Sequence, residues 1–146
     1  MNISPELLKI FDSLKAGKVY YGDFARDGSS HAAVVISVYK GMVNYFCFTS
    51  QEQTIRRYLR NDPLASVSLT EEESGLFFPN GGKQTFIYCG RSNWGQLLEK
   101  TFLEYLSTGK ITLRAELPEE LFTRIKNALR NSRTLTQSNL LEIGLG

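Results

Sequence analysis

The sequence holds a single histidine, and its surroundings suggest a site. It opens the stretch "HAAVVISVYKGMVNYFCFTSQEQ" at His31. Imidazole ordinarily titrates near neutral pH, which makes His31 the natural candidate for a general acid or base. The apolar segments 32–39 and 42–49 predict a hairpin that turns at Lys40-Gly41, so His31 and Thr49 should meet at one end and reach one bound phosphate. The alternative is a turn histidine that bonds a nearby carbonyl.

Other side chains could complete phosphate chemistry beside this histidine. Arg26, in the preceding turn, could stabilise a pentavalent phosphorane, and so could Arg91 after a later strand. The hydroxyls of Thr49 and Ser50 can donate to phosphate oxygens, although the same residues are also favoured as helix caps. Charged loops are more often only solvated.

Basic, amide and aromatic residues are placed where they could bind a single strand of RNA. A cluster in one predicted helix consists of Arg56, Arg57 and Arg60, which could contact phosphates or form a solvated face. A polar rim with an aromatic residue suits base stacking and hydrogen bonding to base edges, with Trp94 equally suited to a core. The candidate RNA-binding residues are Ser50, Gln51, Arg56, Arg57, Arg60, Lys83 and Gln84.

Several function classes leave no trace in the sequence. There is no phosphate-binding glycine motif with its lysine, no nucleophile elbow and no metal-ligand spacing, so we expect neither cofactor nor metal. Cys47 and Cys89 are expected to be buried thiols, although a disulfide between them stays open. The net charge of +2 allows a polyanionic partner without requiring one.

Periodicity and turn residues predict short strands with helices between them. Strands are expected at 18–24, 32–39, 42–49, 65–69, 85–89 and 110–117, and helices at 4–16, 53–63, 96–107 and 118–132. The residues beyond Ser132 are expected to fray. No apolar run is long enough for a membrane span, and the N-terminal residues do not form a signal peptide, so a cytoplasmic protein is expected.

These elements predict one domain over residues 1–146, of the mainly β α+β class. Its parts are an N-terminal helix (1–17), a small barrel or curled sheet with inserted helices (18–117), a C-terminal helix (118–132) and a tail (133–146). The length of 146 residues suffices for one hydrophobic core.

Read together, several segments resemble the MazF/PemK-type toxin family of bacterial toxin–antitoxin pairs. "KVYYGDF" resembles the family's opening strand, "SSHAAVVIS" its "G-H-R-P-A-V-V-L-S" segment and "YFCFTSQ" the strand that ends in "T-S-Q". "SGLFFPN…TFIYCGR" and "LPEELFTRIKNALRNS" are similar to its later strand and closing helix. The match spans roughly residues 18–132.

This resemblance implies an SH3-like β-barrel with a C-terminal helix, to which this chain adds an N-terminal helix. It also implies a homodimer, an antitoxin partner and metal-independent cleavage of single-stranded RNA, in which the 2′-hydroxyl attacks the adjacent phosphate. That chemistry needs a base, an acid and a positive stabiliser. The residues that could supply it are His31, Thr49, Arg26 and Arg91.

Two departures from the family pattern bear on activity. His31 stands where the family commonly places its catalytic arginine, and Gly90 stands where an acidic residue often follows the cysteine. The sequence therefore leaves two alternatives to a ribonuclease. One is a non-catalytic barrel that binds a protein or a nucleic acid, and the other is a toxin that acts on a protein target such as a topoisomerase.

Overall fold

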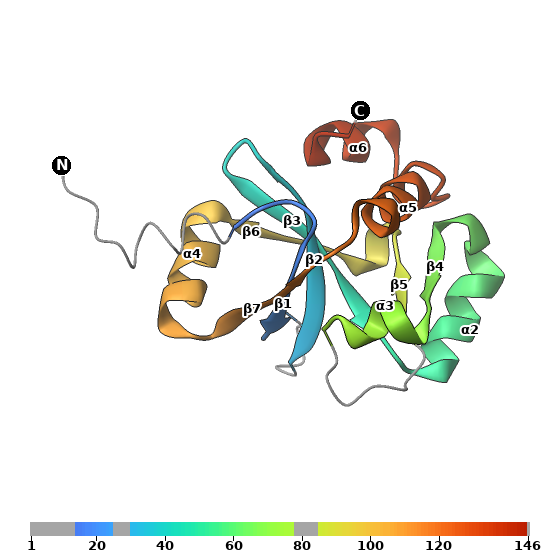
Figure 1. Cartoon of the computed structure of the whole chain (residues 1–146). Coiled ribbons are helices and arrows are strands. Elements are labelled where there is room, and N and C mark those ends of the chain that lie inside the picture. The colour runs from blue at the N-terminus through green and yellow to red at the C-terminus, as the bar shows by residue number, and fades with distance from the viewer. Residues whose placement is uncertain (1–13, 25–29, 78–84, 146) are drawn as a thin grey trace.

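The computed structural model describes residues 14–24, 30–77 and 85–145 (Figure 1). The strands are β1 (Lys18–Gly22), β2 (His31–Tyr39), β3 (Met42–Thr49), β4 (Ser66–Leu69), β5 (Thr85–Tyr88), β6 (Trp94–Leu98) and β7 (Ile111–Glu116). The helices are α2 (Glu52–Asn61), α3 (Glu71–Gly75), α4 (Glu99–Thr108), α5 (Glu119–Arg130) and α6 (Gln137–Ile143), with short 3₁₀ turns at Pro63–Ala65 and Arg91–Asn93.

All the strand pairs are antiparallel, and β3 is the strand on which the sheet is organised. The strand order is β4-β5-β3-β2-β1-β7, and β6 also pairs with β3. The first part of β3, residues 42–46, pairs with β6, whereas Phe48 and Thr49 pair with β5. The described strands thus form a mixed α+β fold around a seven-stranded sheet whose path is open from β4 to β7.

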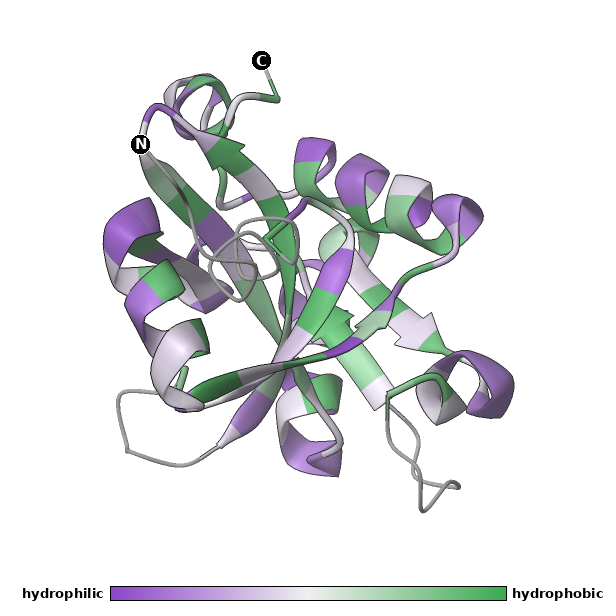
Figure 2. Ribbon diagram, turned by 60° about the vertical axis from the view of Figure 1, so that its left-hand side comes forward, coloured by the Kyte–Doolittle hydropathy of each residue, from purple (hydrophilic) through white to green (hydrophobic). Residues whose placement is uncertain are grey.

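The two faces of the β2–β3 hairpin support different cores. One face carries Val34, Phe46 and Phe48 into a large core shared with α5 and α6. The other face carries Val35 into a smaller core with α4, where the rings of Tyr20 and Phe102 meet edge to face with centroids 5.0 Å apart. Figure 2 shows the hydrophobic residues along these strands and the hydrophilic residues on the outer turns of the helices.

Helix α4 covers only one end of the smaller-core face. It lies at one side of the molecule, while α2 lies at the opposite side (Figure 1). The residues of the smaller core (Leu14, Tyr20, Val35, Val43, Phe102 and Ile111) do not extend to His31 or Thr49 at the other end of the hairpin. Among the described residues, no helix therefore covers the end at which β2 begins and β3 ends.

A buried amide links the hairpin to the C-terminal helix. Asn44 is fully buried, and its Oδ1 accepts hydrogen bonds from Trp94 Nε1 (3.0 Å) and Gln96 Nε2 (2.9 Å). Its Nδ2 donates to Ser37 Oγ at 3.1 Å, and Ser37 Oγ donates to the carbonyl oxygen of Ile143 at 2.6 Å. A bulge in β2 between Val35 and Ser37 brings Ser37 opposite Asn44 and so makes this chain of bonds possible.

Two predicted elements are wrong. The helix expected over residues 96–107 begins only at Glu99, because Trp94–Leu98 forms β6 and hydrogen-bonds to β3. The tail expected to fray contains α6, whose Ile143 is fully buried and whose start is capped by Thr136 and Asn139 in a reciprocal capping box. The short acidic helix α3 was not expected at all.

The remaining predicted elements agree with the structure within a few residues. The strand expected at 42–49 is found with those bounds, and the clearest predicted helix, 118–132, is found at Glu119–Arg130. Most of the expected N-terminal helix lies outside the described residues, and residues 14–17 form no helix. Among the described residues, no helix combines the length and apolar character that crossing a membrane requires.

We expect Asn44→Ala to destabilise the fold. The substitution removes the oxygen that accepts hydrogen bonds from Trp94 and Gln96, and it removes the amide group that donates to Ser37 Oγ. The free energy of unfolding should fall by roughly 1–3 kcal/mol. Urea denaturation followed by tryptophan fluorescence measures this change. Asn61→Ala, at an exposed position, is the matched control and should change the free energy by less than about 0.5 kcal/mol. A wild-type urea midpoint for Asn44→Ala would contradict the structural role of the network.

Candidate functional site: a groove at the open end of the hairpin

A groove of about 1200 Å³ occupies the end of the sheet that α4 leaves open. It is bounded by the hairpin end, α2, the β5–β6 connection and the segment before α6. Its lining residues are Phe24, His31, Tyr45, Cys47, Phe48, Thr49, Gln51, Thr54, Tyr58, Tyr88, Arg91, Ser92, Asn93, Trp94, Gly95, Gln96 and Thr134. Three of the four residues proposed from the sequence for catalysis are among them.

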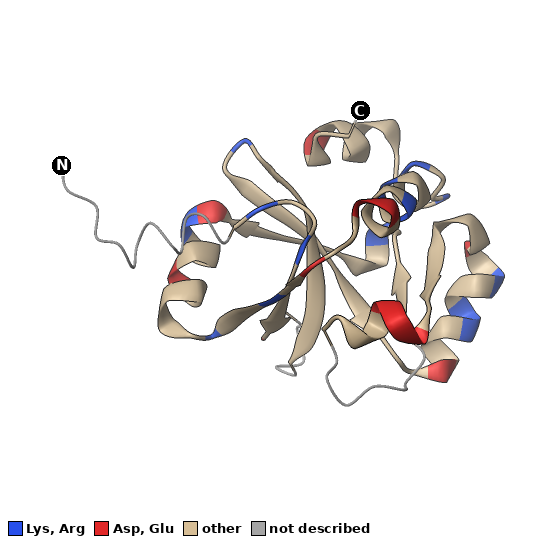
Figure 3. Cartoon of the chain, in the orientation of Figure 1, with Lys and Arg blue, Asp and Glu red and all other residues tan. Residues whose placement is uncertain are grey.

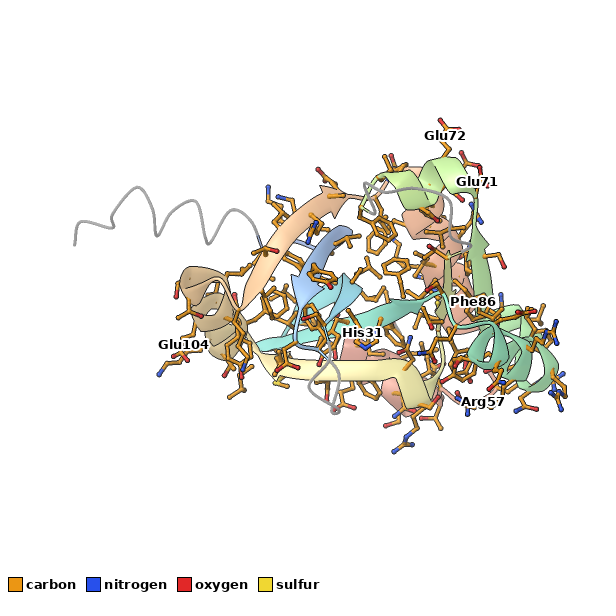
Figure 4. All side chains as sticks on the ribbon, turned by 90° about the horizontal axis from the view of Figure 1, so that it is seen from below. His31, Arg57, Glu71, Glu72, Phe86 and Glu104 are labelled. Carbon is orange, nitrogen blue, oxygen red and sulfur yellow. The ribbon has the colours of Figure 1, made fainter. Side chains whose placement is uncertain are left out.

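The hairpin register places His31 and Thr49 together. Ala33 pairs with Cys47, and continuing this register by two residues brings His31 opposite Thr49. Opposite residues of an antiparallel pair point to the same face, so both side chains belong to the groove face. Figure 4 shows His31 among the strands near the middle of the molecule. The start of β2 and the end of β3 thus face one groove.

Thr49 combines a structural role with an available donor. Its Oγ1 accepts a hydrogen bond from the backbone nitrogen of Gln51 (3.2 Å), which shapes the turn into α2. Gln51 is the N-cap of that helix and makes no side-chain capping bond of its own. Since no described residue accepts the hydroxyl proton of Thr49, this proton can be donated to a ligand oxygen.

The groove exists because β3 changes its partner strand within it. Between the part paired with β6 and the part paired with β5, the carbonyl of Cys47 has no strand neighbour to bond. Asn93 takes that place, and its Nδ2 donates to the oxygens of Cys47 (2.9 Å) and Tyr88 (2.8 Å). The 3₁₀ turn that carries Arg91 is thereby fixed to β3 and β5.

Arg91 supplies the positive charge of the groove. It is exposed in the 3₁₀ turn, and in the described part of the chain no carboxylate forms an ion pair with it. The lining residues that the structure describes include no Asp or Glu. A groove with an arginine, a histidine and no carboxylate suits an anionic ligand.

The packing of Tyr88 explains the glycine that stands in place of the family's acidic residue. A Cβ atom at Gly90 would lie 2.1 Å from Tyr88 Oη, so no side chain fits there while the ring keeps its position. Tyr88 in turn donates to Asp62 Oδ2 at 2.8 Å and stacks on Tyr58 with ring centroids 3.9 Å apart. Burial raises the pKa of Tyr88, which keeps its hydroxyl protonated near neutral pH.

The aromatic part of the groove was largely missed from the sequence. Tyr58, Tyr88 and Thr134 lie in three separate segments, and no sequence pattern indicates that these segments meet. The spacing of Gln51, Thr54 and Tyr58 on one helix face was the available signal, since residues three and four apart share a face. Trp94, which the sequence offered as the aromatic residue of a polar rim or as a core residue, lines the groove, and so does its neighbour Asn93.

The predicted RNA-binding residues are distributed unevenly. Gln51 lines the groove, whereas Ser50, Arg56, Arg57 and Arg60 are exposed and do not. Figure 3 shows the basic residues of α2 on its outer surface, and Figure 4 places Arg57 at the edge of the molecule, away from His31. Arg56 pairs with Glu52, one turn earlier on the helix. The remaining candidates, Arg26, Lys83 and Gln84, lie outside the described residues.

Comparison with known proteins found similarity at the level of solved structures. No family model and no curated protein matches the chain. A chain of a MazE–MazF crystal structure (Form II) from Deinococcus radiodurans is 16% identical, with a TM-score of 0.49 over 80% of this chain and 90% of that one. The Form III structure gives 12% identity and a TM-score of 0.48 over 91% and 98%. Both structures are of MazE–MazF complexes.

The two cysteines are free, and each is unsuited to act as a nucleophile. Burial raises the pKa of the Cys47 thiol to about 12, although this residue lines the groove. Burial and, to a lesser extent, the nearby charge of Asp62 also raise the pKa of Cys89. Within the described ranges, no three His, Cys, Asp or Glu side chains gather as metal ligands would.

We expect the thiol of Cys47 to react slowly at neutral pH and increasingly fast in alkaline solution. The thiolate is the reactive form, so with a pKa of about 12 the alkylation rate should rise about tenfold per pH unit from pH 7 to beyond pH 9. Iodoacetamide labelling of Cys89→Ala, followed by mass spectrometry, measures this rate on one thiol. In urea the alkylation rate of the same thiol should level off above the ordinary thiol pKa of about 8.5. A plateau near pH 9 in the folded protein would contradict the expected shift.

Proposed function

We infer that the groove binds single-stranded RNA and that the protein is a toxin-like endoribonuclease acting in the cytoplasm without a metal. The observation that carries this proposal is the meeting of His31, Thr49 and Arg91 in one groove that has aromatic walls and no carboxylate. A base, a hydrogen-bond donor to the phosphate oxygens and a fixed positive charge are groups that support the attack of a hydroxyl on a neighbouring phosphate.

The walls of the groove fit a strand whose bases are unpaired. Trp94 and Phe24 are half-buried, and the ring of Phe24 packs against that of the buried Tyr45 with centroids 4.9 Å apart. Exposed aromatic faces and amide groups recognise unstacked bases, whereas a duplex offers its bases only in stacked form. Single-stranded RNA is thus the favoured ligand, and its 2′-hydroxyl supplies the nucleophile.

In the proposed reaction the neutral His31 accepts the proton of the 2′-hydroxyl. The 2′-oxygen then bonds to the adjacent phosphorus, while the guanidinium of Arg91 stabilises the charge on the phosphorane and Thr49 donates to a phosphate oxygen. The bond from phosphorus to the 5′-oxygen breaks, and that oxygen takes a proton from solvent. The products are a 2′,3′-cyclic phosphate and a 5′-hydroxyl.

The family resemblance supports the wider setting of this proposal. We propose an antitoxin protein as partner, a homodimer as the working form and closure of the sheet into an SH3-like barrel. The MazE–MazF titles name a complex of two proteins, and an antitoxin that fills the RNA groove would supply carboxylates to Arg91 and His31.

A non-catalytic binding module is the second candidate, and one observation favours it. The described residues that line the groove contain no carboxylate, so none of them places a carboxylic acid beside His31 to protonate the leaving 5′-oxygen. Such a module would bind RNA or a protein and leave RNA intact. A toxin acting on a topoisomerase would likewise leave RNA intact, and would arrest growth.

We expect His31→Ala to abolish cleavage while leaving RNA affinity largely unchanged. General base catalysis contributes about 100-fold or more, so the cleavage rate of a short single-stranded RNA in EDTA should fall by at least that factor. The wild-type rate should rise with pH, because only an unprotonated base accepts the proton of the 2′-hydroxyl, and the residual rate of the variant should lack that rise. Gel analysis of end-labelled RNA measures both.

Thr123→Ala, an exposed change on α5 outside the groove, serves as the matched control and should cleave like the wild type. Equal cleavage by His31→Ala would exclude His31 as the base and would indicate a contaminating nuclease. Binding without cleavage by the wild type would establish the binding module instead. Growth arrest on expression with RNA left intact would point to a protein target.

We expect the outer surface of α2 to guide the RNA beyond the groove. Gln51, Thr54 and Tyr58 face the groove on this helix, and the basic residues lie next to them. RNA affinity should fall linearly with log salt, by a slope of about −0.7 for each phosphate contacted. Charge reversal of both Arg56 and Arg60 should make that slope shallower without moving the pH optimum. An unchanged slope, measured by fluorescence anisotropy, would show that these arginines form only a solvated surface.

A further inference from the structure

A buried carboxylate, that of Asp62, lies behind the wall of the groove. Asp62 follows α2 and is 1% exposed. Its Oδ2 accepts hydrogen bonds from Tyr88 Oη (2.8 Å) and Ser132 Oγ (2.9 Å), and its Oδ1 accepts one from the backbone nitrogen of Arg133 (3.1 Å). A buried charge with this many donors is held firmly in place.

The charge of Asp62 fixes the direction of the hydrogen bonds around it. A carboxylate can only accept, so the hydroxyl protons of Tyr88 and Ser132 are both directed to it. Thr134 Oγ1 lies 3.1 Å from Tyr88 Oη and 3.1 Å from Ser132 Oγ. Since the protons of those two hydroxyls are already used, Thr134 donates its single hydroxyl proton to one of these two oxygens.

The remaining lone pairs of Thr134 are then available on the groove side. The backbone nitrogen of Arg91 donates to Thr134 Oγ1 at 2.9 Å. Arg91 thus begins its 3₁₀ turn on a hydroxyl whose orientation is determined by Asp62. The other end of the turn is fixed by Asn93, as described above.

We propose that Asp62 and Thr134 are positioning residues for Arg91, with Asp62 orienting the Thr134 hydroxyl through Tyr88 and Ser132 so that this hydroxyl holds the peptide nitrogen of Arg91 at the groove. The role of Arg91 toward RNA rests on the proposed function, whereas the hold on its backbone does not. Neither Asp62 nor Thr134 acts on the RNA phosphate in this account. They affect the reaction only by setting the position of the Arg91 guanidinium.

The matched substitutions are at Thr134, which is exposed and therefore tolerates Val. Thr134→Val keeps the shape of the side chain and removes both the acceptor and the donor. Thr134→Ser keeps the hydroxyl. Thr136→Val makes the same chemical change two residues later, at the cap of α6, and controls for loss of stability in this segment.

The first measurement is amide hydrogen exchange in the RNA-free protein, resolved by NMR. We expect the Arg91 amide to exchange about tenfold faster in Thr134→Val and in Asp62→Asn, and at the wild-type rate in Thr134→Ser and Thr136→Val. Asp62→Asn is included because an amide nitrogen donates a hydrogen bond where the carboxylate oxygen accepted one. The hydroxyls of Tyr88 and Ser132 would then no longer both be directed toward residue 62. Unchanged exchange at Arg91 in Thr134→Val would overturn the proposal, whatever the protein does to RNA.

The second measurement is RNA cleavage, or RNA affinity if the protein binds without cutting. We expect Thr134→Val to lower kcat by about tenfold with a smaller change in KM, and Thr134→Ser to restore the wild-type value. In an Arg91→Ala background Thr134→Val should cause no further loss, because its effect passes through Arg91. Equal additional loss in that background would overturn the proposal. A wild-type protein that neither binds nor cuts RNA would refute the proposed function while leaving the exchange result to decide this inference.

Discussion

The structure depends on a change of partner within one strand. Residues 42–46 of β3 pair with β6, whereas Phe48 and Thr49 pair with β5, so the sheet divides at Cys47. A backbone carbonyl left unpaired at such a point is costly, and the Asn93 side chain satisfies it. The division opens the sheet on the face that α4 does not cover, and the amide that closes the hydrogen-bond pattern also anchors the turn carrying Arg91. The hydrogen bond from Asn93 to the Cys47 carbonyl therefore stabilises the fold and shapes the groove at the same time.

How much could be foreseen from the sequence follows from the range of each interaction. The β2–β3 hairpin was predictable because β-branched residues and the turn at Lys40-Gly41 act locally, and this hairpin already placed His31 beside Thr49. β6 was missed because Gln96, Leu97 and Leu98 fit a helix as well as a strand, and only pairing with β3 decides between them. α6 was missed for a related reason, since its burial comes from contacts with β2 made about a hundred residues away.

The departures of this chain from the family pattern become physically connected in the groove. The Tyr88 ring fills the space where a side chain at position 90 would stand, and its hydroxyl belongs to the buried hydrogen bonds of Asp62. The carboxylate of Asp62 lies behind the wall of the groove, where it accepts hydrogen bonds from the neutral hydroxyls of Tyr88 and Ser132. A single substitution at Gly90 cannot place a carboxylate on the groove side, because the tyrosine and its partners would have to move with it.

The bond from Ser37 Oγ to the Ile143 carbonyl has a consequence for the order in which the protein assembles. It joins positions 106 residues apart, and such contacts form late because the intervening chain must first be brought together. The segment from Ser132 to Thr134 that holds Arg91 is also made late in synthesis. A nascent chain on the ribosome can form the β2–β3 hairpin early, yet its groove is complete only when residues up to 143 have emerged. Whatever the groove binds, it can bind only after these residues have been made.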